Sequence, residues 1–212
     1  MAVTRLGAFT AVWTALLAGS VALSLLAAQH ETLPGDTWIM SWAQDRAYPG
    51  EALSDIVRAF TTTEVVLATG AMIVVALWLL GYRWEAGVLA VGLAVLPLLQ
   101  AGLKEIVDRP RPMEPLVTLR TGFSSESFPA GHVMSPALLY GFLLYLTVST
   151  PLPRVVRWLT GIWSVAVIVV AGPPNVWLGV HWPSDVLGGW AWGLVLAGAL
   201  AIVLEGGRAR YT

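Results

Sequence analysis

The sequence predicts an all-α polytopic membrane protein, a six-transmembrane helix bundle with a short interfacial helix between spans one and two. Of its 212 residues, 57% are hydrophobic and 12% are charged, whereas soluble domains carry about 25% charged residues. Apolar stretches of about 20 residues recur, and this length crosses a hydrocarbon core of about 30 Å. No internal repeat or linker divides the sequence. We therefore expect a single integral-membrane domain over residues 1–212.

The six expected spans lie at about residues 6–28, 62–81, 85–107, 132–150, 155–172 and 184–204. The first span follows Arg5 and has some features of a signal peptide. However, its apolar run is longer than a signal h-region, and Leu26 is a poor residue three positions before a cleavage after Ala28. We therefore expect this segment to be retained as a span.

A region of about 33 residues separates the first two spans and is too polar to cross the membrane. Within it, Trp38, Ile39 and Trp42 fall on one helical face, and Asp36 falls elsewhere. This pattern predicts a short helix that lies in the membrane interface. An amphipathic loop helix packed on the bundle fits the pattern equally well.

An even number of spans places both termini on one side of the membrane. That side carries six arginines and two carboxylates, and the other carries six basic residues and eleven carboxylates. The arginines on the side of the termini are concentrated in short connections and tails, where the positive-inside rule applies. We therefore expect a multi-pass protein of the plasma (inner) membrane with cytoplasmic termini.

Several site classes are excluded by composition. The sequence has no cysteine, which excludes disulfides, cysteine-zinc sites and thiol nucleophiles. No cluster of metal-ligating residues is evident, and no basic run favours nucleic-acid binding. The sequence does not indicate an oligomeric state.

The first of three polar clusters lies where the third span ends. Lys104 precedes Arg111-Pro112 by seven residues, and Pro110 and Pro112 force an extended loop. Arginine binds phosphate in a bidentate manner and lysine through a point contact, so the two could hold one phosphate from two sides. A snorkelling lysine and an interfacial arginine are the alternative.

The second cluster, Pro129-Ala130-Gly131-His132, precedes the fourth span. The Gly131-His132 peptide then lies at a helix N-terminus, where free N–H groups attract anions. His132 could donate a proton to a leaving oxygen there. A structural histidine at the interface is the alternative.

The third cluster, His181-Trp182-Pro183-Ser184-Asp185, opens the last span. Asp185 follows His181 by four residues, so its carboxylate could accept the proton of one imidazole nitrogen. The ring would then be oriented, and its second nitrogen would be the better nucleophile. An acidic residue in the first turn of a helix beside an unrelated histidine is the alternative.

In this order the clusters resemble the signature of the type 2 phosphatidic acid phosphatase superfamily of integral-membrane lipid phosphatases. That signature is Lys-x6-Arg-Pro, then Pro-Ser-Gly-His, then Ser-Arg-x5-His-x3-Asp. The matching residues here are Lys104, Arg111-Pro112, Pro129, Gly131-His132, His181 and Asp185. The resemblance implies a phosphatase-like domain, and the topology expected from the charge distribution places all three clusters on the outer face of the membrane.

The resemblance also implies a role for each matched residue. His181 would attack phosphorus and form a phosphohistidine, with Asp185 orienting its ring. His132 would protonate the leaving lipid hydroxyl and later activate water. The phosphoryl oxygens would be held by Lys104, Arg111 and the Gly131 amide. This mechanism requires no metal and no cofactor.

Three positions depart from the signature. Ala130 replaces serine, and Pro174 and Asn175 replace Ser-Arg. Asn175 could still donate to phosphate through its amide, but without charge. The missing charge matters because one arginine on a transferring phosphoryl group can be worth ~10³–10⁵ in rate. Arg109 and Arg120 are the candidates to replace it, unless they face lipid headgroups.

Two functions follow from these expectations. The first is a lipid phosphate or polyprenyl (di)phosphate phosphatase, undecaprenyl substrates included, that releases inorganic phosphate. The alternative is a catalytically weak or inactive relative that binds, transports or scaffolds an anionic lipid. The expected partners are the lipid phosphate substrate and membrane lipids, and nucleic acid is not among them.

Overall fold

The structure is a computed structural model that describes residues 2–47, 49–123 and 125–209. These residues form helices joined by loops, and none of them lies in a strand. The helices are α1 (Ala2–Gln29), α2 (Asp36–Gln44), α3 (Glu51–Thr61), α4 (Thr63–Leu79), α5 (Arg83–Val107), α6 (Gly131–Ser149), α7 (Arg154–Val170), α8 (Pro173–Trp177) and α9 (Pro183–Arg208). The all-α prediction is confirmed.

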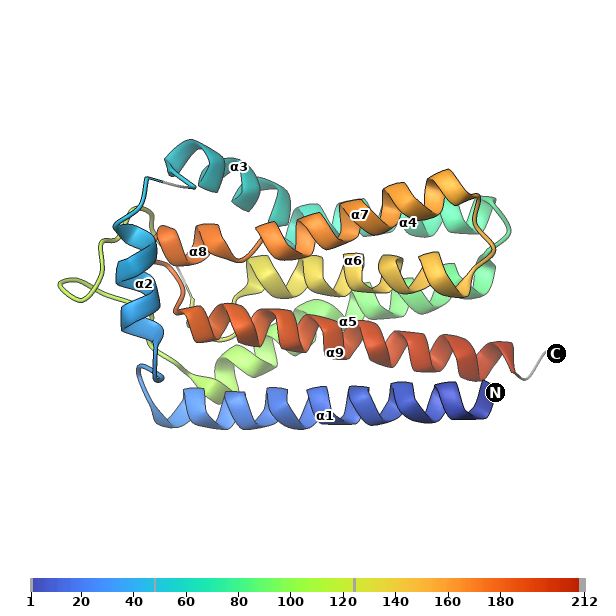
Figure 1. The fold of residues 1–212 in the computed structure, drawn as a ribbon, viewed down its shortest axis with the longest axis horizontal. Coiled ribbons are helices and arrows are strands. Elements are labelled where there is room, and N and C mark those ends of the chain that lie inside the picture. The colour runs from blue at the N-terminus through green and yellow to red at the C-terminus, as the bar shows by residue number, and fades with distance from the viewer. Residues whose placement is uncertain (1, 48, 124, 210–212) are drawn as a thin grey trace.

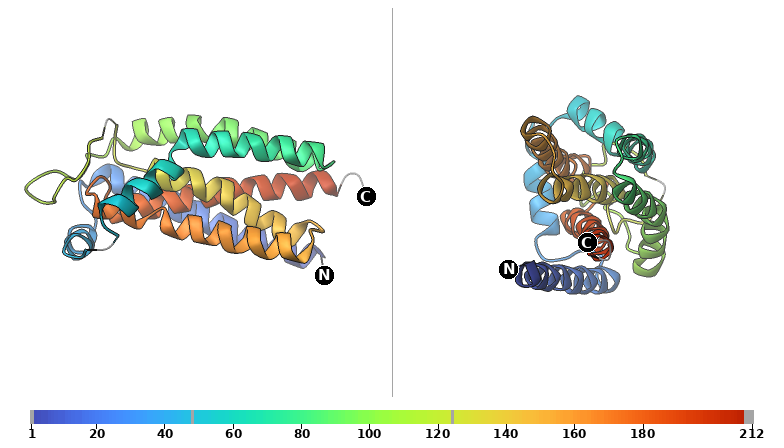
Figure 2. Two further views of the ribbon diagram at one scale, coloured as in Figure 1. Left: turned by 90° about the horizontal axis from the view of Figure 1, so that it is seen from above. Right: turned by 90° about the vertical axis from the view of Figure 1, so that its right-hand side faces the viewer.

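Six long helices, α1, α4, α5, α6, α7 and α9, run along the long axis of the molecule (Figure 1). Seen from the end, α6 and α9 occupy the interior and the others surround them (Figure 2). The core is made of fully buried side chains such as Leu89, Leu138 and Phe142. Gly193 lets α9 approach α6 closely, because a Cβ atom there would lie 2.5 Å from the carbonyl oxygen of Met134.

The second expected span differs from the prediction. Five helices are long and apolar enough to cross a membrane, counted over the described residues, and α3 and α4 pass the same test only together. Alone, α4 has 17 residues, fewer than the roughly 20 that cross a bilayer. The two helices are bent by 50° at Thr62. Residues 51–61 fall in the region that was too polar to be predicted as a span, and charged Asp55 and Arg58 lie among their apolar residues.

The predicted short helix before this segment is α2, which crosses the end of the bundle at a steep angle to the long helices (Figure 1). Trp38 is 69% exposed, and Ile39 and Trp42 are also exposed. Asp36 and Met40 face inward and are buried. An exposed apolar face is typical of a helix in the membrane interface, so it favours this interpretation over a packed loop helix.

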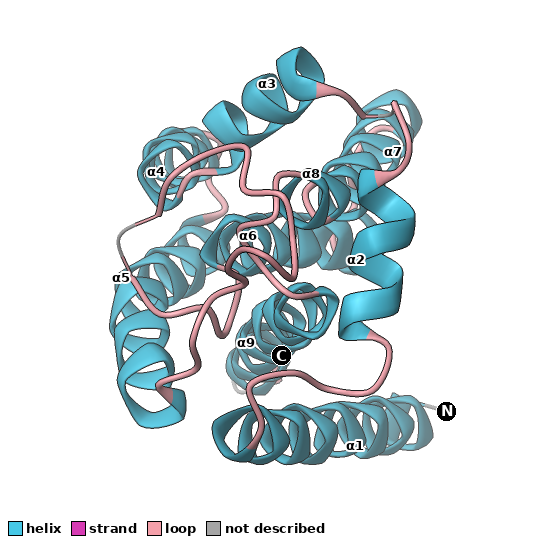
Figure 3. Cartoon of the chain, turned by 90° about the vertical axis from the view of Figure 1, so that its left-hand side faces the viewer, coloured by secondary structure: helices cyan, strands magenta, loops and turns pink. Residues whose placement is uncertain are grey.

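The loops at the α2 end of the bundle form a cap over the tips of α6 and α9 (Figure 3). The start of α1 and the end of α9 lie together at the opposite end (Figure 1). Both termini therefore lie on one side of the bundle, as an even number of spans requires. The cytoplasmic location of that side stays a prediction.

Candidate active site

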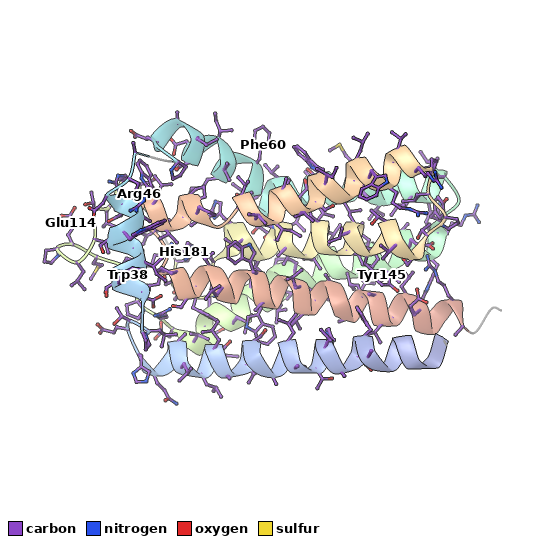
Figure 4. All side chains as sticks on the ribbon, viewed as in Figure 1. Trp38, Arg46, Phe60, Glu114, Tyr145 and His181 are labelled. Atoms are coloured by element: carbon purple, nitrogen blue, oxygen red, sulfur yellow. The ribbon has the colours of Figure 1, made fainter. Side chains whose placement is uncertain are left out.

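All seven predicted site residues lie at the capped end of the bundle, away from the chain termini. They are Lys104 in the last turn of α5, Arg111 in the following loop, Gly131 and His132 at the start of α6, Asn175 in α8, His181 before α9, and Asp185 in the first turn of α9. Figure 4 shows His181 at this end and Tyr145 near the other.

His181 is held between a carboxylate and a guanidinium. Its side chain is 2% exposed, and its Nδ1 lies 3.7 Å from Oδ2 of Asp185. Its Nε2 lies 3.2 Å from Nη1 of Arg111. We assign the ring proton to Nδ1, because that atom faces the carboxylate and the proton position follows from the hydrogen-bond partners. The lone pair of Nε2 then points to the side of the cations.

Burial also determines the charge of this histidine. Burial above all, together with the charges of Arg111 and Lys104 and against an opposing effect of Asp185, lowers the pKa of His181 to about 4. The imidazole is therefore neutral at pH 7, the form in which it can act as a nucleophile.

Asp185 is fixed by the start of α9 and by its neighbours. Its Oδ2 accepts a hydrogen bond from the backbone N–H of Trp182 at 2.9 Å and another from the hydroxyl of Ser127. Pro183 at the first position of the helix and Asp185 at the third position form a capping arrangement with Trp182. The carboxylate is fully buried and has a single orientation available to it.

Arg109 holds the other oxygen of this carboxylate, which differs from the role considered in the sequence analysis. It is 1% exposed, and its Nη1 donates to Oδ1 of Asp185 at 2.6 Å and to Ser184 at 2.7 Å. Its Nη2 donates to Asp36 at 2.8 Å. Arg109 is therefore a buried positioning residue and faces neither lipid headgroups nor a phosphate.

Arg120 does not reach the site either. Its guanidinium donates to the carbonyl oxygen of Trp177 at 2.8 Å and lies 4.3 Å from the centre of that indole ring. It therefore does not supply the missing cation.

The side chains of Lys104 and Arg111 both donate hydrogen bonds to the loop at Ser125 and Glu126. Nζ of Lys104 donates to the carbonyl oxygen of Glu126 and, at 3.3 Å, to the hydroxyl of Ser125. Arg111 donates to the carbonyl oxygens of Ser125 and Val180, each at 2.6 Å. Arg111 thus contacts His181, and Lys104 shares its loop partners and lies within Coulombic range of His181.

Burial is the largest influence on the pKa of Arg111 and lowers it to about 10. The charges of Asp185 and Glu126 oppose this decrease, and the charge of Arg58 adds to it. Arg111 therefore remains positive at neutral pH.

The start of α6 supplies N–H groups beside these cations. The N-cap residue Ala130 makes no side-chain cap hydrogen bond, and the first N–H groups of a helix have no acceptor within it. His132 is partly buried and lies within Coulombic range of Arg58, His181, Arg111 and Lys104. The helix start therefore offers donors and an imidazole to the same space that the cations surround.

Asn175 occupies the motif position of the missing arginine, and both polar atoms of its side chain are engaged. Nδ2 donates to the carbonyl oxygen of Ala171 at 2.8 Å, and Oδ1 accepts from Nη1 of Arg58 at 3.3 Å. Its backbone oxygen accepts the N–H of His181 at 3.2 Å. Its donation to a phosphate stays a prediction, whereas its contacts to His181 and Arg58 are present.

Sequence reasoning missed Asp36, Ser127 and Arg58. The carboxylate of Asp36 accepts hydrogen bonds from the backbone N–H of Ser184 at 2.9 Å and from the hydroxyl of Ser184 at 2.7 Å, although 148 residues separate the two in the sequence. None of the three residues stands inside a motif, so only their polarity in an apolar sequence marks them. Among the described residues, no group of three His, Asp or Glu side chains is placed to hold a metal ion.

Comparison with known proteins gives one family. A family model of the PAP2 superfamily matches residues 85–206. Phosphatidylglycerophosphatase B of Bacillus subtilis (strain 168) is 40% identical over 102 residues, which cover 47% of this chain and 48% of that protein. The chain thus aligns with about half the length of this curated relative.

A solved structure matches nearly the whole chain. It is the crystal structure of a transmembrane PAP2 type phosphatidylglycerolphosphate phosphatase from Bacillus subtilis, with a TM-score of 0.77 and 24% sequence identity. The match covers 94% of this chain and 97% of that chain. At this identity the likeness shows the fold alone, and it confirms the predicted membrane helix bundle.

Proposed function

This chain belongs to the PAP2 superfamily, and from that premise we propose that it is a membrane lipid phosphatase that works through a phosphohistidine at His181. One observation carries the proposal. A buried neutral imidazole has one nitrogen towards Asp185 and the other 3.2 Å from Arg111. This arrangement supports His181 as the nucleophile and the neighbouring cations as the groups that would hold its phosphoryl target.

In the first step, Nε2 of His181 forms a bond to phosphorus, and the bond from phosphorus to the lipid oxygen breaks. The developing imidazolium charge is stabilised by Asp185, whose own position is held by Arg109. Lys104 and Arg111 stabilise the charge on the phosphoryl oxygens. Because Arg111 already contacts Nε2 of His181, a bound phosphoryl group would replace that contact with one to its own oxygen.

His132 is the proposed proton carrier. It gives its proton to the leaving lipid oxygen and then accepts one from the water that attacks the phosphohistidine. The bond between nitrogen and phosphorus breaks in this second step, which releases inorganic phosphate and restores neutral His181. An aryl phosphate needs little help from an acid because its leaving group is stable as an anion. Hence His132→Gln should reduce kcat/KM, which reports the first step, at least tenfold more for a lipid phosphate than for an aryl phosphate.

The lipid part of the substrate has an apolar surface beside the site. A groove of about 310 Å³ lies between α3, α4, α6 and α7, lined by side chains such as Val57, Phe60 and Trp163. Its lining residues Val57 and Phe60 lie on α3, the helix that also carries Arg58, so we expect the groove to hold the acyl or prenyl chain of the substrate. This supports a lipid phosphate or polyprenyl (di)phosphate as the substrate.

Phosphate release by purified protein tests the function. The panel contains phosphatidylglycerophosphate, chosen because of the name of the Bacillus subtilis relative, together with phosphatidic acid, undecaprenyl phosphate and undecaprenyl diphosphate. We expect release from at least one of these lipids, and loss of at least 10³-fold with His181→Ala. His30→Ala is the matched control, because His30 is exposed and makes no side-chain contact at the site. Wild-type activity equal to that of His181→Ala on every lipid would contradict the proposal.

The alternative is a weak or inactive relative that binds an anionic lipid as a carrier or scaffold. The replacements at Ala130 and Asn175 favour it, because each removes a donor of the family motif. It predicts lipid binding that survives His181→Ala and no phosphate release by either protein.

We also propose that residues 1–212 act as one domain and that the site faces the outer leaflet. Because the sequence has no cysteine, single cysteines report topology directly. Glu114→Cys in the loop at the capped end (Figure 4) should react with a membrane-impermeant maleimide in intact cells. Arg154→Cys at the start of α7 should react only after lysis. The reverse pattern would place the site in the cytoplasm.

A further inference from the structure

We propose that Arg58 completes the phosphate site, supplying from α3 the cation that the third motif lacks at Asn175. The inference rests on the proposed function, since it assigns one more residue that touches the transferred phosphoryl group. Arg58 lies outside residues 85–206, the part that matches the family model. The site would therefore combine family motifs with an arginine from another part of the chain.

The contact with Asn175 places this arginine. Nη1 of Arg58 donates to Oδ1 of Asn175 at 3.3 Å, so its guanidinium lies against the side chain that stands where the motif has arginine. Among the described residues this is the one hydrogen bond that its guanidinium makes. An arginine has five N–H donors, which leaves donors for the oxygens of a phosphate.

Arg58 lies within Coulombic range of the catalytic residues, and Asp55 on its own helix is the carboxylate whose charge acts on it. The charge of Arg58 acts on Arg111 and on His132, and for His132 it is the largest of the charge effects. Asn175 is neutral, so it accepts a hydrogen bond from Arg58 without neutralising it. An arginine at position 175 would instead repel Arg58.

Lys104, Arg111 and Arg58 share a further property. Within the described ranges, none of the three has a carboxylate oxygen within 4.0 Å, whereas Arg109 and Arg208 each pair with two carboxylates. Unpaired cations gathered at one place repel one another, and an anion bound between them relieves the repulsion. A phosphoryl group has the charge and the oxygens to do so.

The bend between α3 and α4 brings Arg58 to this position. At the bend, Thr63 contacts the hydroxyl of Ser135 at 2.9 Å and Oε1 of Gln100 at 3.2 Å. Gln100 in turn donates to Ser135 at 2.8 Å and to the carbonyl oxygen of Gly131 at 3.5 Å. The bend is thus tied to the first turns of α6, which carry His132. From this anchor α3 turns across the capped end towards α8 (Figures 1 and 3).

Four variants in the full-length protein test the inference: Arg58→Gln, Arg58→Lys, the double variant Arg58→Gln/Asn175→Arg, and Arg46→Gln as the control. Arg46 lies at the same end of the bundle (Figure 4), is exposed, and donates to the carbonyl oxygen of Trp42 in the preceding helix α2. Three quantities are measured in detergent: kcat for the best lipid phosphate, the increase in melting temperature caused by orthovanadate, and the melting temperature without ligand. Vanadate mimics the transferring phosphoryl group, so it reports binding without turnover.

We expect Arg58→Gln to lose ~10²–10³ in kcat, the cost of removing one preorganised donor from a transition state. Stabilisation by vanadate should fall with it, because less ligand is bound at the same concentration. Arg58→Lys should retain part of both. The double variant moves the arginine to the motif position and should recover at least tenfold in kcat over Arg58→Gln. Arg46→Gln should match wild type.

Two results would overturn the inference. One is an Arg58→Gln variant within threefold of wild type in kcat with unchanged stabilisation by vanadate. The other is a loss that follows the melting temperature and is restored neither by Arg58→Lys nor by the double variant. If Arg58→Gln does not fold, the double variant decides: folded and active supports the inference, and folded but inactive overturns it. A wild type that releases no phosphate but binds vanadate through Arg58 would instead overturn the proposed function and retain the anion site.

Discussion

The Arg109 cluster gives the sharpest prediction about stability. Arg109 is 1% exposed and joins Asp185, Asp36 and Ser184 at distances of 2.6–2.8 Å. In Arg109→Gln the shorter neutral side chain cannot bridge the two carboxylates, so both remain buried with a lost partner. Breaking a buried ion pair on one side costs about 3–5 kcal/mol, because the remaining charge stays uncompensated.

This free energy translates into a large thermal shift. In a protein of this size, 1 kcal/mol corresponds to about 2–4 °C in melting temperature, so we expect a decrease of about 6–20 °C. The assay is thermal unfolding of purified protein in detergent micelles, followed by tryptophan fluorescence and by size-exclusion chromatography of heated samples. Arg46→Gln, which removes an exposed arginine, should change the melting temperature by less than about 2 °C.

A double variant separates the lost charge pair from a general packing defect. Asp36→Asn removes one of the two carboxylates, so Arg109→Gln/Asp36→Asn should be destabilised by less than the sum of the two single changes. The reasoning would be refuted by a melting temperature of Arg109→Gln within about 2 °C of wild type. Strict additivity in the double variant would refute the coupling between Arg109 and Asp36.

Three further predictions concern pH, packing and metals. With an aryl phosphate as substrate, kcat/KM should fall only as the pH drops through about 4. Burial lowers the pKa of His181 to about 4, so the neutral ring persists above that pH. A half-maximum of kcat/KM near pH 6.5 would contradict this prediction. Gly193→Ala should lower the melting temperature by about 2–12 °C, because the new Cβ would lie 2.5 Å from the carbonyl oxygen of Met134 and overpacking costs about 1–3 kcal/mol. Gly206→Ala is the control and should change the melting temperature little, since nothing lies within 4 Å of its Cβ. Equal shifts in the two variants would contradict the close packing of α9 on α6 at Gly193. Treatment with EDTA should leave kcat within about twofold of its starting value, because side-chain cations provide the charge that a metal would otherwise supply. A loss of kcat that a divalent cation restores would contradict this prediction.

The membrane class and five of the six spans were predictable from local sequence. Apolar stretches of span length are read directly from composition, because the bilayer sets the length of any helix that crosses it. The second span was harder to predict, since α4 is short and completes a crossing only with α3, bent by 50°. Polar Asp55 and Arg58 concealed α3, because an amphipathic segment has no continuous apolar run.

The candidate site likewise has a part that local sequence predicted and a part that it did not. The spacings of Lys104 to Arg111 and of His181 to Asp185 are local, so the sequence alone indicated the motifs that the structure brings to one end of the bundle. The role of His181 as the nucleophile stays a prediction. From the sequence, Arg109 and Arg120 are the candidates to supply the charge that the motif lacks at Asn175. The structure places the first between buried carboxylates and the second against Trp177.

The sequence by itself determined the helical membrane fold, the three motifs and the family. The tertiary structure alone decided that Arg109 orients Asp185 and that Arg58 reaches Asn175 from 117 residues away. The physical reason is that a hydrogen bond acts over about 3 Å whatever the separation along the chain. A partner so distant in sequence leaves no local pattern, and it becomes visible only when the helices that carry both groups are packed together.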